Sequence, residues 1–305
     1  MSFASVLRGA SLLAVGACIV FASLAQPAKP EEPAVRAMLA RYTALQKDLE
    51  HNAFGRPLHL DSRQAGNELS GDVYAVQEHP YARLNAALDS ADNWCDILIL
   101  HFNVKRCTHS EGAAPGKLTL YIGTKRAAQA DSGQRVEFDF HVRKDTADYL
   151  RVELHADKGP LGTSNFNIVL EAAPLPADRS FIHLYYAYSY GTLARLATQA
   201  YLGTIGSDKV GFSVVGHAAD GRPVYVDDVR GIIERNTMRY YLAIDTYIAT
   251  LGATSNAQLD DRLRRWFAAT EQYARQLHEI SESDYLKMKR AEIEPARHPA
   301  PAGGD

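Results

Sequence analysis

VEFDFHV at residues 136–142, LRVELH at 150–155 and SFIHLYYAYSY at 180–190 decide the fold of this chain. The first two alternate apolar with polar residues, so every second side chain falls on the same face of a strand. Residues 118–122 and 166–171 alternate in the same way, whereas 180–190 is apolar on both faces. The five segments predict an antiparallel sheet with one apolar and one polar face, in which the last strand is central or covered.

A long helix predicted at Asp228–Leu251 is the best cover for the apolar face. Its apolar stripe includes Ile233, Tyr240 and Ile244, and its second half is apolar nearly all round, which is typical of a buried helix. The predicted fold class is α+β: a curved antiparallel sheet gripping a long C-terminal helix, with extra N- and C-terminal helices. A sheet curled around a helix leaves a cavity in which an apolar guest can sit.

The same patterns predict further elements on both sides of the sheet. They are a helix at 34–49, a strand pair within 58–79 that turns at Gly66-Asn67, a helix after Pro80, a second helix from Asp92, a buried turn or strand at 97–100, a helix at 192–202, and a hairpin at 210–226. Asp228 is the predicted N-cap of the long helix.

The C-terminal region carries the pattern of a strong helix. Ser255 and Gln258 fit a capping box, and apolar or aromatic residues then recur every three or four positions from Leu259 to Ile280. We expect this seam to fold back on the body of the protein. A dimer or another protein as its partner is the alternative.

The first 25 residues have the layout of a secretory signal. Arg8 supplies one positive charge, Ala10–Val20 is an apolar run, and Ser23-Leu24-Ala25 precedes Gln26 as a cleavage site. The apolar run is short compared with the roughly 20 residues of a membrane span, so cleavage is favoured over an uncleaved anchor. The protein is therefore expected to be periplasmic or secreted.

Removal of the leader takes Cys18 away and leaves Cys95 and Cys107, an even number in a compartment that permits oxidation. This predicts a disulfide between them. The alternative is a metal cluster of Cys95, His101, Cys107 and His109, but their spacing matches no familiar zinc pattern.

Charge and motifs exclude several classes of function. The net charge is −3, from 33 Lys and Arg against 36 Asp and Glu, and the mature region has no basic block, so nucleic acid is not an expected partner. The chain lacks the Gly-x-Ser-x-Gly, His-Glu-x-x-His and glycine-rich phosphate-loop motifs. No catalytic residue, metal site or cofactor is predicted.

The order of elements from Leu58 to Leu251 resembles the START and Bet v 1-like helix-grip superfamily. Asn93-Trp94-Cys95-Asp96-Ile97-Leu98, Asn103-Val104-Lys105 with Cys107, and Arg235-Asn236-Thr237-Met238-Arg239-Tyr240-Tyr241 are in addition similar to a group of uncharacterised exported proteobacterial proteins. The superfamily resemblance implies a cavity for lipids, sterols or other apolar molecules, and some members are cyclases or hydrolases. The insertion at Lys209–Val226 and the extra terminal helices depart from the simple pattern.

These patterns divide the chain into five predicted parts. They are a signal peptide at 1–25, a linker and N-terminal helix at 26–56, a START-like helix-grip domain at 57–253, a C-terminal helical extension at 254–294 and a disordered tail at 295–305.

Candidate ligand-binding residues lie on the apolar face of the strands and on the long helix. They are Phe138, Phe140, Val152, Leu154, Phe166, Ile168, Tyr186, Tyr188, Arg235, Asn236, Arg239, Tyr240, Ile244 and Tyr247. Arg235 and Arg239 are one turn apart and can converge on a carboxylate or phosphate, unless they are solvated or paired with acids. The tyrosines suit either an amphipathic pocket or ordinary core packing.

Charged residues and histidines occupy the polar face of adjacent strands. They are Glu137, Asp139, His141, Arg143, Arg151, Glu153 and His155. A metal site or an acid–base pair is conceivable there, but a cross-strand ladder of ion pairs is the commoner arrangement.

The leading functional hypothesis is a binding or carrier protein for a hydrophobic, lipid-like small molecule held between sheet and long helix. The alternatives are an enzyme of cyclase or hydrolase type that uses the same cavity, and an interaction scaffold that uses the C-terminal helix seam. A membrane surface or a protein partner stays open, as does the oligomeric state.

Overall fold

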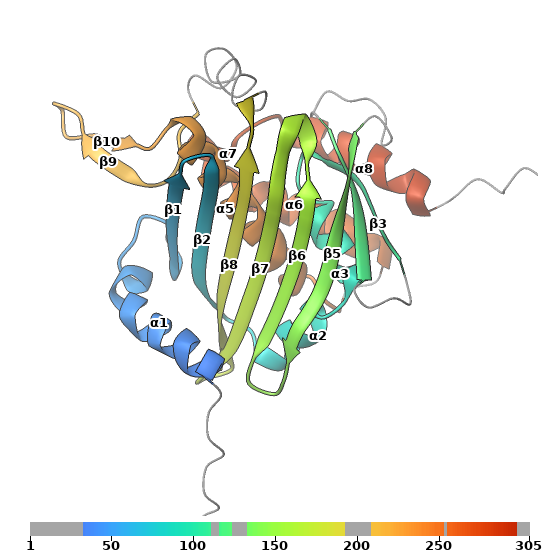
Figure 1. Cartoon of the computed structure of the whole chain (residues 1–305), viewed down its shortest axis with the longest axis horizontal. Helices are drawn as coiled ribbons and strands as arrows, with labels where there is room; N and C mark the ends of the chain where they lie inside the picture. The colour runs from blue at the N-terminus through green and yellow to red at the C-terminus, as the bar shows by residue number, and fades with distance from the viewer. Residues whose placement is uncertain (1–32, 111–115, 124–132, 193–208, 253–254, 298–305) are drawn as a thin grey trace, which may run out of the picture. The chain divides into compact units, whose positions relative to one another are not determined.

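The computed structural model describes residues 33–110, 116–123, 133–192, 209–252 and 255–297 (Figure 1). An eight-stranded antiparallel sheet dominates it, with the order β1-β2-β8-β7-β6-β5-β4-β3. Its strands are β1 (Leu58–Ala65), β2 (Glu68–Gln77), β3 (Val104–Ser110), β4 (Gly116–Ile122), β5 (Gln134–Asp145), β6 (Leu150–Lys158), β7 (Thr163–Leu175) and β8 (Arg179–Tyr190).

The predicted strands are confirmed, including the pair β1–β2 that turns at Gly66-Asn67. β8 pairs with both β2 and β7. Its central position explains why its sequence is apolar on both faces: Ile182 and Leu184 face the main core, whereas Phe181 belongs to a second cluster on the opposite face. We call the face toward α5 (Asp228–Ala249) the inner face and the opposite one the outer face.

α5 lies on the inner face beside β1, β2 and β8, and one glycine fixes how closely it approaches. A Cβ atom on Gly71 of β2 would lie 2.3 Å from the side-chain oxygen of Thr237. Thr237 is fully buried, and its hydroxyl donates a hydrogen bond of 2.8 Å to the carbonyl of Ile233. Any larger residue at position 71 would therefore push the helix away from the sheet. The helix-grip arrangement is the predicted fold class.

Two short helices and a disulfide close the inner core. α2 (Tyr81–Leu88) follows Pro80, and α3 (Ala91–Leu98) carries the fully buried Trp94. Cys95 of α3 is bonded to Cys107 of β3, with their Cα atoms 5.2 Å apart, which confirms the predicted disulfide. Because both sulfur atoms are engaged, the alternative metal cluster is wrong.

The edge strand β3 was missed by the sequence patterns. Its residues, VKRCTHS, do not alternate, and its register with β4 shifts between Val104 and Arg106. Lys105 is fully buried as a result, in contact with α8 (Glu282–Arg297). The segment 97–100 ends α3 and forms a turn.

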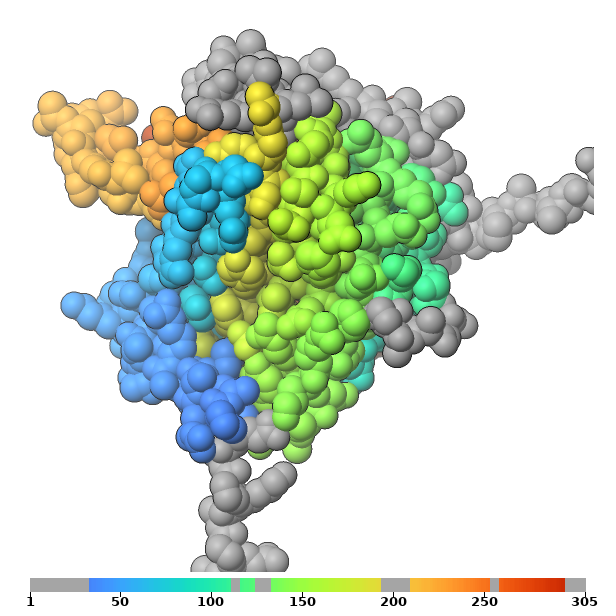
Figure 2. Space-filling model, viewed as in Figure 1, coloured from blue at the N-terminus to red at the C-terminus, as the bar shows by residue number. Residues whose placement is uncertain are grey.

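The predicted N-terminal helix is present as α1 (Pro33–Glu50), and it packs against the outer face of the sheet (Figure 2). Val35, Met38 and Leu49 share a buried cluster with Val76 and Phe181. Both faces of the sheet are thus covered over part of their length.

The C-terminal seam folds back on the inner layer, as predicted, but it is not one helix. α6 (Ser255–Glu271) ends before α7 (Ala274–Leu277), and α8 follows. The break lies next to Tyr273, whose hydroxyl donates to the carbonyl of Phe54 at 2.8 Å. This tertiary contact outweighs the helical periodicity. Leu263 and Trp266 of the seam are fully buried within the chain.

The predicted hairpin is also present, as β9 (Val214–His217) and β10 (Pro223–Tyr225), and it extends from the body in Figure 2. The N-cap assignment was wrong. Asp227 is the N-cap residue of α5 and makes no side-chain cap hydrogen bond, because Asp228 adopts a positive φ of 57° where the helix begins.

The predicted leader, residues 298–305 of the predicted tail and nearly all of the helix at 192–202 lie outside the described residues. The first three residues of that tail, 295–297, belong to α8. Among the residues that are described, no helix is both long enough and apolar enough to cross a membrane.

Gly71→Ala should lower the free energy of unfolding by about 2 kcal/mol, because the new methyl group overlaps Thr237. Urea denaturation measures this. Gly216→Ala is the matched control, since its Cβ would meet no atom within 4 Å, and it should change stability by less than about 0.5 kcal/mol. Adding Thr237→Ala to Gly71→Ala should restore part of the loss. Equal effects of the two alanines would contradict the close approach.

Reduction of the Cys95–Cys107 bond, or Cys95→Ala with Cys107→Ala, should cost about 3 kcal/mol on the loop-entropy model. Denaturation with and without reductant tests this. An unchanged denaturation midpoint, after free thiols have been detected, would show that the bond does not stabilise the fold.

Candidate functional site

Aromatic side chains from β7, β8 and α5 meet on the inner face. The ring centroids of Phe166 and Tyr188 are 5.2 Å apart, and those of Tyr186 and Tyr188 are 5.8 Å apart. Tyr240 of α5 meets Tyr186 edge-on at 5.1 Å, so the contact joins helix to sheet. Such pairs stabilise by about 0.5–1.5 kcal/mol each beyond the burial of their area.

His101 extends this chain of rings from the turn between α3 and β3. Its ring stacks on Tyr240 with centroids 5.0 Å apart, and only 3 % of the residue is exposed. Nδ1 accepts the backbone N–H of Asn103 at 3.1 Å, whereas Nε2 makes no well-formed hydrogen bond within the described ranges. Burial lowers the pKa of His101 to about 3, and the charges of Arg239 and Lys289 act in the same direction. The imidazole is therefore neutral at pH 7.

Three polar side chains lie beside these rings. Tyr188, Asn236 and Tyr240 are partly exposed; the two phenols hydrogen-bond to no other described residue, and the Asn236 amide lies within hydrogen-bond reach of His101. Desolvation nevertheless raises the pKa of both Tyr188 and Tyr240 to about 12. Polar groups in such surroundings need water or a ligand as partner. We call His101, Phe166, Tyr186, Tyr188, Asn236 and Tyr240 the inner tyrosine site.

The other sheet residues predicted to bind ligand lie in the same buried core. They are Phe138, Phe140, Val152, Leu154 and Ile168, and Ile244 of α5 belongs with them. Phe138 meets Phe166 at 6.3 Å, so the wall of β5–β7 is continuous with the inner tyrosine site.

Three residues of α5 that were predicted to bind ligand contact other parts of the protein. Arg239 pairs with Glu279 at 2.7 Å and also donates to the carbonyl of Leu277. Arg235 donates to the carbonyl of Val210 at 3.2 Å. Tyr247 lies under the guanidinium of Arg262, 4.1 Å from its ring centroid. An anion bound by the predicted arginine clamp would have to compete with these partners, and the clamp stays a prediction.

A buried group of charges supports the turn that carries His101. Lys105 and Lys289 are fully buried, and each lies 2.7 Å from a carboxylate oxygen of Glu292. Lys289 also donates to the carbonyls of His101 and Val104, at 3.2 and 2.7 Å. Burial lowers the pKa of Lys289 to about 8, although Glu292 opposes the shift. Because its hydrogen bonds are satisfied by the protein, Lys289 anchors α8 to β3.

The outer face carries a ladder of ion pairs. Arg151 contacts Glu153 at 2.8 Å and Glu171 at 3.0 Å. His183 lies between Glu171 and Asp72, 2.8 Å from each. Burial disfavours ionisation of Glu171, but bonds from His183 and Tyr149 outweigh it and lower the pKa of Glu171 to about 2. The charges of this face are matched across strands, which is the commoner of the two predicted arrangements.

Within the described ranges, no group of three or more His, Cys, Asp or Glu residues is placed to hold a metal ion. Further ion pairs on the outer face join neighbouring strands, Lys117–Asp139 and Arg143–Glu153, or lie within β5, Arg135–Glu137, each at 2.7 Å.

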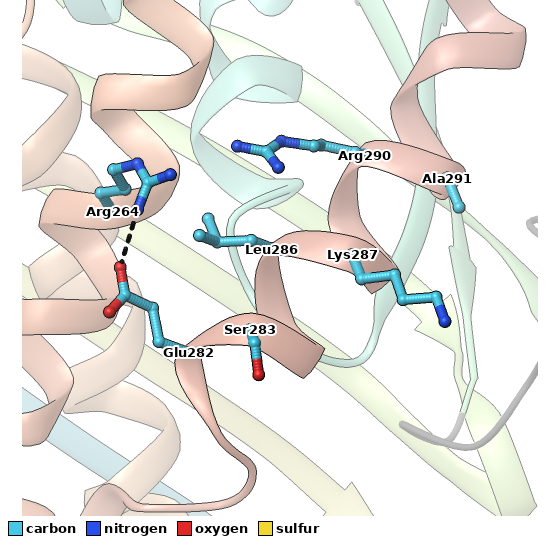
Figure 3. Close-up of a pocket in the computed structure, with 7 residues that line it drawn as sticks. All are labelled: Arg264, Glu282, Ser283, Leu286, Lys287, Arg290 and Ala291. Carbon is cyan, nitrogen blue, oxygen red and sulfur yellow. Dashed lines mark hydrogen bonds and ion pairs between the residues drawn. The ribbon is translucent and has the colours of Figure 1, made fainter.

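A surface groove of about 650 Å³ lies between α6 and α8 (Figure 3). Arg264 pairs with Glu282 at 3.2 Å and with Asp260 at 3.1 Å, and Arg290 also contacts Asp260. Figure 3 shows Lys287 reaching away from the Arg264–Glu282 pair. These exposed side chains hold one another, and exposed ion pairs of this kind stabilise by roughly 0–1 kcal/mol.

His101 is the residue that sequence reasoning missed. It was considered only as a metal ligand, and the one signal for it is a histidine set between Leu100 and Phe102 after an apolar run. Its stacking on Tyr240 depends on a contact between positions far apart in the chain, which periodicity does not report.

No protein-family model matches the chain, and no curated protein matches it. Among solved structures, a conserved protein from Geobacillus kaustophilus aligns with 59 % of this chain and 95 % of its own, at 11 % identity and a TM-score of 0.34. Ara h 8.0201 aligns over 63 % and 99 %, at 10 % identity and a TM-score of 0.35. Norcoclaurine synthase from Thalictrum flavum aligns over 48 % and 87 %, at 9 % identity and a TM-score of 0.32. The fold described above rests on the strand order and packing of the chain itself.

The neutral His101 makes stability depend on pH. Its pKa is about 3 when folded and close to 6.5 when unfolded, so below pH 6.5 the unfolded state binds a proton that the folded state does not. Stability should therefore fall as pH drops from 6.5 toward 3, and by pH 4 His101 alone should account for about 3 kcal/mol.

Urea denaturation of wild type and His101→Gln at pH 7 and pH 4 isolates this contribution, because other groups titrate in both proteins. The wild type should lose about 3 kcal/mol more than the variant between the two pH values. Equal losses would mean that His101 becomes protonated in the fold.

Proposed function

We propose that this protein binds a hydrophobic, lipid-like small molecule at the inner tyrosine site, between the sheet and α5. The observation that carries the proposal is the state of Tyr188, Asn236 and Tyr240. They lie among buried aromatic rings and keep part of their surface accessible; the two phenols hydrogen-bond to no described residue, and the described contact of the Asn236 amide is with His101. A bound molecule would cover the rings and supply the missing partners.

The composition of the site suits an amphiphile with a large apolar part. Phe166 and the rings of Tyr186 and Tyr188 offer aromatic surface, and burial of apolar area stabilises a complex by about 25 cal/mol per Å². The phenol hydroxyls and the Asn236 amide are few and local, so they would orient the guest and contribute little to its total affinity.

The two alternatives have less support. Leu263 and Trp266 of the C-terminal seam are buried in the chain's own core, so a scaffold would have to use another surface. An enzyme would need a reactive group at the site, and the imidazole of His101 is held neutral with one nitrogen already bonded to backbone. We place binding or carriage first, in the periplasm or outside the cell, which the secretory pattern of residues 1–25 and the disulfide support.

The test compares the same bulky substitution on the two faces of β8. Tyr188→Trp should weaken binding of the fluorescent polyene methyl cis-parinarate about tenfold, since overfilling a packed site costs about 1–3 kcal/mol. Tyr185→Trp is the matched control, because residue 185 faces outward beside Asp72. Fluorescence titration measures both affinities.

Equal affinities of the two variants, or no binding by the wild type, would overturn the proposal. Organic extraction of the protein purified from its native compartment, followed by mass spectrometry, then identifies the natural guest.

A further inference from the structure

The hydrogen-bonding state of His101 is determined by its neighbours. Nδ1 accepts the N–H of Asn103, so in the neutral ring the proton must be on Nε2. Nε2 is buried and makes no well-formed hydrogen bond in the described part of the protein. An N–H group in this position needs an acceptor, because leaving it unpaired costs about 1–3 kcal/mol.

Among the described side chains, the Asn236 amide is placed to accept a hydrogen bond from this Nε2–H. It is close enough to raise the pKa of His101, against the larger effect of burial. Asn236 and Tyr240 are one turn apart on α5 and so share a face, and Tyr240 stacks directly on His101. If the amide oxygen accepts from Nε2, the amide NH2 group points away from His101 and can donate to a guest.

The two arginines beside the site are already engaged by protein groups. Arg239 is paired with Glu279, and Arg235 already donates to the Val210 carbonyl. A carboxylate entering the site would lose its hydration without a cation committed to it, which costs far more than the burial of a carbonyl. A neutral acceptor fits the donors that are present.

Resting on the function proposed above, we infer that the guest presents a neutral carbonyl group, as in an ester or ketone, to the Asn236 amide. His101 is the positioning residue that turns the amide toward it. The neighbouring hydroxyls of Tyr188 and Tyr240, which have no hydrogen-bond partner among the described residues, would donate to the same carbonyl.

The experiment compares two probes that differ only in this group, cis-parinaric acid and its methyl ester, by fluorescence titration of the full chain at pH 7. The ester should bind about tenfold more tightly than the acid. Asn236→Leu, which is nearly isosteric at a partly exposed position, should weaken ester binding about tenfold and remove most of the preference.

Tighter binding of the acid would overturn the inference and favour the arginine clamp. An ester affinity that stays within about twofold in Asn236→Leu would overturn it as well. In both cases the protein still binds a lipid-like molecule, so the proposed function survives. Binding of neither probe would overturn both proposals.

The positioning role of His101 has its own test. His101→Gln keeps an N–H donor and should keep the ester-to-acid preference, whereas His101→Leu should lose it. Both variants are first shown to unfold cooperatively. If they change the preference equally, His101 does not act through Asn236.

Discussion

The close approach of α5 to β2 is the constraint on which the rest of the structure depends. Because residue 71 has no side chain, Thr237 can occupy the space where a Cβ atom would lie. Contact at this one point sets the height of the helix above the sheet. On the neighbouring flank of the same helix, Tyr240 meets Tyr186 of β8. A carrier needs such a rigid frame, since a site whose walls collapse loses its space for a guest.

The interior is more polar than a simple hydrophobic container requires. Lys289 and Glu292 tie the C-terminal helix to the turn of His101, which in turn stacks on Tyr240. The C-terminal helix α8 is thereby connected to the inner tyrosine site through His101. Its contacts hold the turn of the neutral His101 in place, and Glu279, between α7 and α8, engages Arg239. These contacts are the basis on which we propose recognition of a specific polar group on an otherwise apolar molecule.

Much of the fold could be predicted because the spacing of apolar residues within single strands and helices indicates it. The alternation in β5, β6 and β7 and the stripe of α5 each report one face of one element. β3 and the break at Tyr273 were missed, since a shifted register and a contact with Phe54 leave no periodic trace. The alternation of β8 and the stripe of α5 predict the inner-face positions of Tyr188 and Tyr240, and their role in binding a ligand stays a prediction. His101 and the partners of Arg239 were not predicted, because they depend on how separate elements meet.

The central claim is that a guest binds at the tyrosines of β8 and α5. Fluorine NMR of the protein labelled with fluorotyrosine, titrated with methyl cis-parinarate, tests it most directly. The account predicts that the resonances assigned to Tyr186, Tyr188 and Tyr240 move together at the concentration at which the probe binds, while those of Tyr74 and Tyr185 on the outer face stay in place. Shifts confined to the outer-face tyrosines, or no shifts at saturating probe, would contradict it.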